Sequence, residues 1–333
     1  MKTIIAKNNK VEIVEREVPE LKPSYLLIRT IYSVISPGTE LLGIHVSNDR
    51  EINLGYSAVG VIEECGENTQ EYKKGDIVAC YGAPYVHHAQ YLHVPKTLCS
   101  IVPTNVDLKE AALAGIGAIA IHAIRIANLS FGEKVVVAGL GIIGQIIAQI
   151  SDASAYDVYA YDLSTERTDL LSNYPNIKLF TERSQMEKEI DAKEKYKGAD
   201  AVLLCAGGKK SPLPEQSLSW IRDKGKIVIV GDIEPVFPRE KMFSKEASIL
   251  ISRAGGPGRY DDVYEKQAID YHYGFIRWTE GRNLGEYLRL VSEKRINVHS
   301  YLSEEVAFKD IRTAYDELTN KDSSILTKVI KFE

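Results

Sequence analysis

Three glycines in the sequence have the spacing of a phosphate-binding turn. Gly139, Gly141 and Gly144 follow the apolar stretch 134–138 and precede the helical pattern "IIGQIIAQI". In such a turn the first glycine allows a tight bend, the second lets the backbone approach a pyrophosphate, and the third allows helix and strand to pack closely. The N-terminus of the helix then faces the anion. A structural strand-to-helix turn is the alternative.

An acidic residue follows where a dinucleotide would place its ribose. Asp162 ends the next apolar stretch, and a carboxylate there accepts hydrogen bonds from ribose hydroxyls. Its charge repels a 2′-phosphate and so favours NAD(H) over NADP(H), although Arg167 could reach such a phosphate. Asp162 could instead cap the following helix. The sequence therefore predicts an NAD(H) site at Gly139, Gly141, Ile142, Ile143, Gly144, Asp162, Leu163, Arg167, Cys205 and Ala206.

Side chains that could move a proton lie in the first third of the chain. Tyr56 stands between a glycine and a serine in "LGYSAVGVIEECG", where it either contacts a substrate or is a half-buried aromatic at a strand start. Tyr81, His87 and His88 occur in "YGAPYVHHAQY". Adjacent histidines on an extended chain point to different sides, so at most one faces a substrate, and we choose His87 as the candidate.

A second group of polar side chains lies in "ISRAGGPGRYDDVYEKQAIDYHYGFIRWTEGRN", residues 251–283. Its glycines allow unusual backbone, and its arginines and aromatics offer fixed donors and flat surfaces. This composition predicts a site for a polar, anionic or polyhydroxylated ligand at Arg253, Arg259, Tyr260, Arg277 and Trp278. An ordered loop that braces a dimer or closes a domain interface is the alternative.

Two kinds of hydrophobic pattern must position these residues. Up to about residue 110, short alternating segments predict a β-rich domain. From 133 to 253, continuous apolar strands alternate with helices, which predicts a parallel sheet covered on both faces. We expect an α/β protein with a β-rich domain over 1–120, a Rossmann doubly wound domain over 121–270, and a return segment over 271–333 that completes the first domain.

Composition excludes several classes of protein. A net charge of −5 gives no basic field for nucleic acid or an anionic membrane. The four cysteines are far apart, without the close pairs of zinc sites or disulfide frameworks. No stretch is typical of a signal peptide or a spanning helix. We expect a cytoplasmic protein that binds neither nucleic acid nor membrane.

The order of these features resembles the medium-chain dehydrogenase/reductase superfamily, which includes the alcohol dehydrogenases and quinone reductases. The resemblance rests on the motifs "SPGTEL", "GYSAVGVIEECG", "KKGDIVA", "VPTNVDLKEAALAGIGAIAIHAI" and "VVVAGLGIIG". The resemblance implies a GroES-like first domain. At the positions of the zinc ligands this chain has Pro37, Tyr56 and Ile116, which are not the donors such sites use, so we expect no metal. It also places Thr39 at a hydroxyl proton relay and Glu40 at an acidic, usually structural, position.

Residues 251–283 resemble a segment of zinc-lacking members, notably the N-terminal half of bacterial two-domain oxidoreductases. The resemblance as a whole implies a zinc-independent, NAD(H)-dependent oxidoreductase that interconverts a hydroxyl and a carbonyl on a polar metabolite, such as a sugar or cyclitol derivative. The candidate catalytic residues are Tyr56, Thr39, Glu40 and His87. The alternatives are an NADH-dependent C=C or imine reductase and a non-catalytic NAD(H)-binding module. We expect a homodimer or homotetramer.

Overall fold

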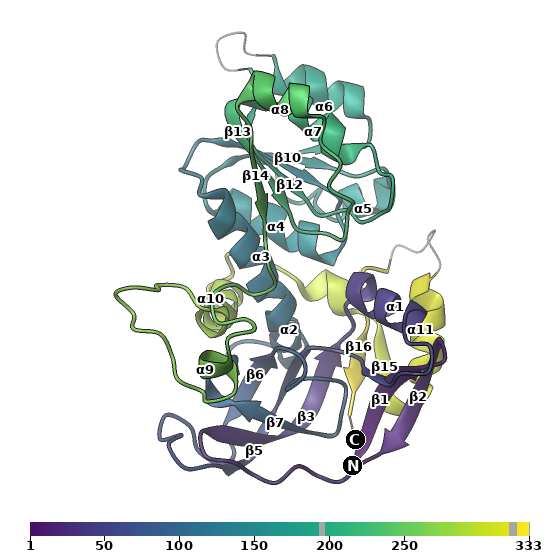
Figure 1. Ribbon diagram of the computed structural model, residues 1–333, viewed down its shortest axis with the longest axis vertical. Helices are drawn as coiled ribbons and strands as arrows, with labels where there is room; N and C mark the ends of the chain where they lie inside the picture. The colour runs from purple at the N-terminus through teal and green to yellow at the C-terminus, as the bar shows by residue number, and fades with distance from the viewer. Residues whose placement is uncertain (193–196, 320–324, 333) are drawn as a thin grey trace. The chain divides into compact units, whose positions relative to one another are not determined.

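The computed structural model describes residues 1–192, 197–319 and 325–332. The chain forms two compact units, one made of Met1–Ile119 and Ala254–Glu333, the other of Ala120–Arg253 (Figure 1). The first unit is rich in antiparallel strands, and the second contains a parallel sheet with helices. The predicted α/β fold class is therefore confirmed.

The first unit is built mainly from short strands. They are β1 (Lys2–Lys7), β2 (Lys10–Glu15), β3 (Tyr25–Val34), β4 (Ile52–Asn53), β5 (Ser57–Cys65), β6 (Ile77–Tyr81), β7 (Tyr91–Pro95), β8 (Cys99–Ile101), β15 (Glu305–Ala307) and β16 (Val329–Lys331). Its helices are α1 (Pro37–His45), α2 (Leu108–Ala112), α9 (Asp262–Glu265), α10 (Glu280–Ser292) and α11 (Ile311–Thr319), with 3₁₀ turns η1 (Lys96–Leu98), η3 (His299–Leu302) and η4 (Phe308–Asp310).

A seven-stranded sheet in the order β15-β16-β3-β5-β6-β8, with β7 beside β3, forms the centre of the first unit. β1 pairs with β2 and β4 in a smaller sheet. Alternating residues of β3 and β5 face a buried apolar cluster that includes Leu26, Ile28 and Ile62. The return of the chain through β16 adds a strand directly beside β3, so the C-terminal segment completes this unit.

The second unit begins within α3 (Ala114–Ala127), which contains the boundary between Ile119 and Ala120. Its strands are β9 (Lys134–Ala138), β10 (Asp157–Tyr161), β11 (Ile177–Phe180), β12 (Ala199–Leu204), β13 (Ile221–Ile229) and β14 (Ser248–Ile251). Its other helices are α4 (Ile142–Ala153), α5 (Thr165–Asp169), α6 (Arg183–Ile190), α7 (Leu213–Trp220) and α8 (Arg239–Lys245).

The six strands of the second unit are all parallel, in the order β11-β10-β9-β12-β13-β14. Every residue of the central strand β9 is buried, because both faces of the sheet are covered. The strand order reverses next to β9, between β10 and β12, and ligands of such sheets bind beyond the carboxyl ends of the strands at that point. The glycine turn that follows β9 lies there.

The segment 254–270, expected in the second domain, belongs to the first unit instead. Tyr264 is buried in the apolar cluster of the first unit, and its carbonyl accepts a hydrogen bond from Thr97 Oγ1 at 2.9 Å. The Tyr25 hydroxyl donates to Lys266 O at 2.8 Å. No local sequence pattern indicates these long-range contacts. The domain boundary was therefore expected near residue 270, whereas the structure has it at residue 253.

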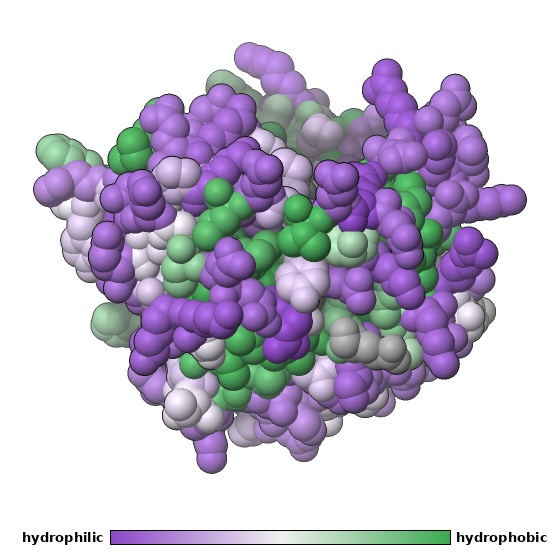
Figure 2. All heavy atoms as spheres, turned by 90° about the horizontal axis from the view of Figure 1, so that it is seen from below, coloured by the Kyte–Doolittle hydropathy of each residue, from purple (hydrophilic) through white to green (hydrophobic). Residues whose placement is uncertain are grey.

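One face of the molecule carries mostly polar side chains. Figure 2 shows one face, on which hydrophilic side chains predominate and hydrophobic ones show between them. Among the residues described, no helix is both long enough and apolar enough to cross a membrane.

Candidate functional site

The glycine turn after β9 is fixed by close packing. Gly139 has a φ of +98°, and a Cβ added there would lie 2.6 Å from Ala206 N. A Cβ on Gly144 would lie 1.9 Å from Gly139 O. Gly141, the N-cap of α4, differs because a Cβ there would meet nothing within 4 Å. Gly139 and Gly144 are therefore required by the fold, whereas Gly141 leaves open space at the N-terminus of a helix.

Asp162 connects the end of β10 to this turn. Its Oδ2 accepts a hydrogen bond from Leu140 N at 2.6 Å, and its Oδ1 accepts one from Ser164 N at 2.9 Å. Arg167 Nη1 lies 3.7 Å from Oδ2. A carboxylate can accept about four hydrogen bonds, so Asp162 retains acceptor capacity for a ligand while it holds the turn.

A pocket of about 930 Å³ adjoins the turn, entirely within the second unit. Most of the predicted coenzyme residues line it, namely Gly139, Gly141, Asp162, Leu163, Arg167, Cys205 and Ala206. Ile142, Ile143 and Gly144 are not among its lining residues, and Gly144 packs against the Gly139 carbonyl. The residue types present fit a dinucleotide, because open backbone at Gly141 and an acceptor at Asp162 are what a pyrophosphate and a ribose need.

Sequence reasoning missed other residues of this pocket. Thr181 and Arg183 follow β11, and Gly207 follows β12. All three lie beyond the carboxyl ends of parallel strands, so the signal was the strand pattern itself rather than a motif.

Tyr56 lies in the first unit, at the turn that enters β5. Its hydroxyl donates to Ser36 Oγ at 2.5 Å, and its ring meets that of Tyr81 edge-on at 5.9 Å between centroids. Burial raises the pKa of Tyr56 to about 12. The phenol therefore stays protonated at neutral pH and acts as a hydrogen-bond donor.

A buried hydrogen-bond network holds Ser36 in place. Glu40 Oε1 accepts from Ser36 N at 2.7 Å, and Glu40 Oε2 accepts from the Tyr315 hydroxyl. His88 Nε2 lies 2.9 Å from the same Oε2, and its Nδ1 lies 2.7 Å from Ser33 Oγ. Glu40 is thus a positioning residue whose carboxylate is already occupied. This agrees with the structural role that the resemblance implied, and a catalytic role of Glu40 stays a prediction.

Of the two neighbouring histidines, His88 lies against the tyrosine turn. A Cβ on Gly55, which has a φ of +89°, would lie 2.5 Å from the His88 ring. His87 Nδ1 is buried without a hydrogen-bond partner among the described residues, and burial lowers its pKa to about 4. His87 as a proton donor therefore stays a prediction. Thr39 is exposed in the first turn of α1.

The residues at the zinc-ligand positions do not fit a zinc ion. Pro37 begins α1, Ile116 is buried within α3, and Tyr56 is a neutral phenol. A Cβ on Gly115, next to Ile116, would lie 2.5 Å from Tyr81 Cδ2, so aromatic packing fills this region. Over 1–192, 197–319 and 325–332, no three His, Cys, Asp or Glu side chains are placed to hold a metal ion.

The predicted substrate residues are divided by the structure. Arg259 is brought near Tyr56, because its Nη1 lies 3.4 Å from the Cβ position of Gly82, whose N donates to Tyr56 O. Its Nη1 also pairs with Glu265 Oε1 at 2.6 Å, so its charge is compensated rather than available to an anion.

The other four predicted substrate residues have other surroundings. Tyr260 is exposed and stacks on Arg259. The Arg277 guanidinium stacks on Trp278, 3.7 Å from the ring centroid, and also on Tyr273. Arg253 is exposed and ends the second unit. Ser36 was not predicted as a site residue, although it precedes Pro37 as a helix cap does.

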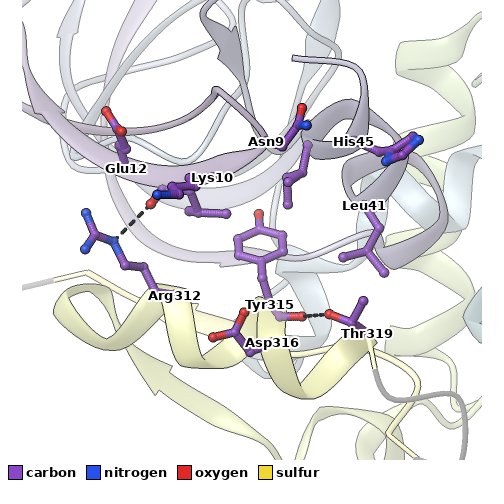
Figure 3. A pocket seen from close by; sticks show the side chains of 11 residues that line it. Asn9, Lys10, Glu12, Leu41, His45, Arg312, Tyr315, Asp316 and Thr319 are labelled. Atoms are coloured by element: carbon purple, nitrogen blue, oxygen red, sulfur yellow. Dashed lines mark hydrogen bonds between the residues drawn. The ribbon is translucent and has the colours of Figure 1, made fainter. Parts of the chain in front are cut away.

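A second cavity, of about 660 Å³, lies in the first unit between β2, α1 and α11 (Figure 3). Tyr315 projects between the other labelled side chains, and Arg312 Nε donates to Val11 O at 3.0 Å. The rim carries charges of both signs, from Lys10, Glu12 and Asp316 among others. Because Tyr315 is the residue that donates to Glu40, this cavity adjoins the network that positions Ser36.

In its fold and its glycine turn, the chain is similar to the medium-chain dehydrogenases of the alcohol dehydrogenase type. No family model matches it. It is 25% identical to the probable D-xylulose reductase A of Aspergillus clavatus, over 93% of this chain and 91% of that protein. Galactitol-1-phosphate dehydrogenase from Escherichia coli has the same fold over 100% of both chains, with a TM-score of 0.79 and 17% identity. A short chain alcohol dehydrogenase from Escherichia coli CFT073, solved in complex with NADH, covers 100% of this chain and 99% of its own, at a TM-score of 0.78 and 18% identity.

Proposed function

We propose that the chain is an NAD(H)-dependent oxidoreductase that interconverts a hydroxyl and a carbonyl group on a polyol-like metabolite without zinc. The observation that carries the proposal is the pocket at the glycine turn, where Gly141 leaves room and Asp162 offers acceptors. The similarity to a D-xylulose reductase and to galactitol-1-phosphate dehydrogenase supports a polyol or sugar substrate. A bound nicotinamide would supply or accept the hydride.

Tyr56 would take over the polarisation that a metal performs in other dehydrogenases. Its phenol is neutral, and rotation of its O–H bond away from Ser36 Oγ would let it donate to the oxygen on which negative charge develops. Glu40, His88 and Tyr315 would hold Ser36 rigidly, which lowers the cost of orienting the donor.

Turnover assays test this proposal directly. The purified protein should oxidise NADH with D-xylulose or a related ketose, and reduce NAD⁺ with the corresponding polyol. Chelators should leave the rates unchanged, and elemental analysis should find no stoichiometric zinc. Oxidation of NADH only by an activated alkene or imine would favour a reductase of those groups. NADH binding without turnover of any of these compounds would favour a binding module.

The substitution Tyr56→Phe separates donation from packing, because it keeps the ring and removes the hydroxyl. We expect kcat to fall about 10²–10³-fold, as for the loss of one donor to a developing oxyanion. Tyr25→Phe is the matched control, since its hydroxyl donates to the Lys266 carbonyl and not to Ser36. Equal rates for the wild type and Tyr56→Phe would assign Tyr56 to packing alone.

We also propose that the chain assembles into a homodimer or homotetramer through β14, the edge strand of the parallel sheet. β14 is the last strand of that sheet, and Ile251 at its end is 70% exposed. An unpaired strand edge favours pairing with another copy of the same edge.

A further inference from the structure

Two cysteines that are far apart in the sequence lie directly opposite each other in the first unit. Cys80 is in β6 and Cys99 begins β8, and the register of these antiparallel strands pairs the two residues. Both side chains belong to the same buried apolar cluster, so they lie on the same face of the sheet. Their spacing along the chain could not indicate this, because only the folding of β8 beside β6 brings them together.

The hydrogen bonds between β6 and β8 determine how closely the two cysteines approach. Val102 N donates to Ile77 O at 2.9 Å, which makes these two residues a hydrogen-bonded pair of the ladder. Hydrogen-bonded and non-hydrogen-bonded pairs alternate along antiparallel strands. Counted along the register from Ile77 and Val102, Cys80 and Cys99 form a non-hydrogen-bonded pair, the type in which opposite side chains are closest.

This arrangement suits a disulfide bond. The Cα atoms of a non-hydrogen-bonded pair are about 4.5 Å apart, within the range of about 4.4–6.8 Å that a disulfide bridges. Both cysteines are free. Each thiol makes only a weak contact, Cys80 Sγ with Ala58 O at 3.6 Å and Cys99 Sγ with Pro95 O at 3.8 Å. A bond between the two sulfurs would therefore need little movement of the backbone.

Neither of the other two cysteines lies opposite a cysteine. Cys65 ends β5, where the register places it opposite Leu26, and Cys205 follows β12 in the second unit. Both are more exposed than Cys80 and Cys99. Exposure and pairing therefore favour different cysteines, and an oxidation experiment can distinguish the two.

The paired cysteines become accessible through β8. This strand has three residues and is the last strand of its sheet, and Ile101 at its end is 50% exposed. Local opening of such a short edge strand costs less free energy than unfolding of the whole unit. Burial, and then the neighbouring Cys80, raise the pKa of Cys99, so its reactive thiolate forms when β8 opens.

We propose that Cys80 and Cys99 are a site of reversible oxidation, at which a disulfide bond fastens β8 to β6. Hydrogen peroxide oxidises the Cys99 thiol to a sulfenic acid, and its O–O bond breaks to release one water molecule. The Cys80 sulfur then attacks the Cys99 sulfur. The S–O bond breaks, and the hydroxide takes up the Cys80 proton and leaves as a second water molecule. A dithiol reductant reverses the oxidation and restores both thiols.

The loop that the disulfide closes, residues 81–98, contains side chains that pack against the tyrosine turn and its network. The Tyr81 ring meets the ring of Tyr56, and His88 Nε2 lies 2.9 Å from Glu40 Oε2. A disulfide restricts the unfolded chain and makes opening of β8 less favourable. Oxidation should therefore stabilise the first unit around these side chains.

Peptide mapping tests the inference, because trypsin cuts after Lys96 and so separates the two cysteines. The folded wild type, first reduced and then treated with hydrogen peroxide, should give peptides 75–96 and 97–109 joined by a disulfide bond. Free thiols are alkylated before digestion, so that no bond forms afterwards. The melting temperature should rise by several degrees on oxidation. A dithiol reductant should reverse both changes.

Cys80→Ala and Cys99→Ala should each lose the linked peptides and the rise in melting temperature. Cys65→Ala is the matched control, because Cys65 is a more exposed cysteine of the same unit, and it should keep both effects. If neither test variant folds, the peptide map of the wild type decides alone.

Three results for the wild type would overturn the inference. In the first, Cys80 and Cys99 stay reduced while Cys65 or Cys205 is oxidised. In the second, the paired cysteines become separate sulfinic acids, or are linked only after the protein is unfolded. In the third, the linked peptides form but the melting temperature is unchanged, because the bond would then not fasten β8.

Discussion

Asp162 combines a structural and a proposed recognition role in one carboxylate. It holds Leu140 N and Ser164 N, and its charge lies at the pocket wall. The wild type should bind NADH at least tenfold more tightly than NADPH, a difference of about 1.4 kcal/mol. Asp162→Asn should bring the two affinities closer together, because the amide no longer repels a 2′-phosphate. Fluorescence titration with both coenzymes measures this.

Arg167 supplies the control for that experiment. It lies 3.7 Å from Asp162 and is partly exposed, so it can turn toward a phosphate. If Arg167→Ala weakens NADPH binding but not NADH binding, Arg167 accommodates the phosphate. Equal affinities of the wild type for both coenzymes would show that the charge of Asp162 does not select between them.

Glu280 should make the stability of the protein depend on pH in an unusual direction. Its folded-state pKa is about 8, whereas the ordinary value is 4.5. Between these values the unfolded chain binds fewer protons than the folded chain, so the free energy of unfolding falls as pH rises. Glu280→Gln cannot ionise and should be more stable than the wild type at pH 8, by on the order of a few kcal/mol.

Urea unfolding of both proteins from pH 4.5 to 8.5 measures the difference. Near pH 4.5 the two should converge. His87 and His122 have pKa values of about 4 because they are buried, so both proteins lose stability below about pH 6.5. Only the difference between them therefore reports on Glu280. A constant difference across the range would show that Glu280 is ionised in the folded chain.

The position of a candidate site residue could be predicted from the sequence where a motif fixes the conformation of the backbone. Gly139, Gly144 and Asp162 fall in a spacing that only one local geometry satisfies. The choice between His87 and His88 depends on the direction of an irregular segment, which the sequence does not fix, and His87 as a catalytic residue stays a prediction. The raised pKa of Glu280 depends on burial by distant elements, which no local pattern encodes.

At the scale of an element, two glycines of the turn from β9 to α4 have different roles. We expect one to affect the stability of the protein and the other to affect ligand binding. Gly144→Ala places a Cβ 1.9 Å from Gly139 O, so we expect a loss of stability of about 1–3 kcal/mol or more. Gly141→Ala meets open space at an ordinary φ of −67° and should leave the melting temperature unchanged. It should lower NADH affinity about tenfold, because the methyl group would occupy the path of the pyrophosphate.

Calorimetry and coenzyme titration of the two variants check this pair of expectations. Each variant serves as the control for the other, since both add one methyl group to the same turn. Tight NADH binding by Gly141→Ala would show that the coenzyme does not bind at the N-terminus of α4.

The sequence predicts the strands well where all residues of a strand are buried. The apolar strands of the parallel sheet agree with the continuous patterns, because both faces of that sheet are covered. The stretch "HSYLSEEVAF" has a strand-like pattern, but it forms η3 and then only the short β15. Tyr301 and Leu302 are buried there by tertiary contacts, which an alternation of polar and apolar residues cannot distinguish from a strand.

At the scale of the whole molecule, the order of the two units could be predicted because a β-rich pattern changes to an α/β pattern and then returns. The sequence does not predict which unit contains residues 254–270, because hydrogen bonds from Tyr25 and Thr97 attach this segment to the first unit. The association of whole chains belongs to this scale too, and the sheet edge bears on it. β14 pairs with β13 on one side, and in the described part of the chain no strand covers its other side.

We predict that light scattering will give at least twice the mass of one chain for the wild type. Pairing of two β14 edges about a twofold axis would satisfy the unpaired N–H and C=O groups and bury Ile251. Ile251→Lys places a charge on that edge and should shift the protein toward the monomer, with the secondary structure retained. Phe131→Lys is the control, because Phe131 is 84% exposed in the same unit but lies in a turn before β9. If both variants keep the mass of the wild type, another surface holds the chains together. A wild type that is monomeric at all concentrations would show that the edge of β14 does not pair at all.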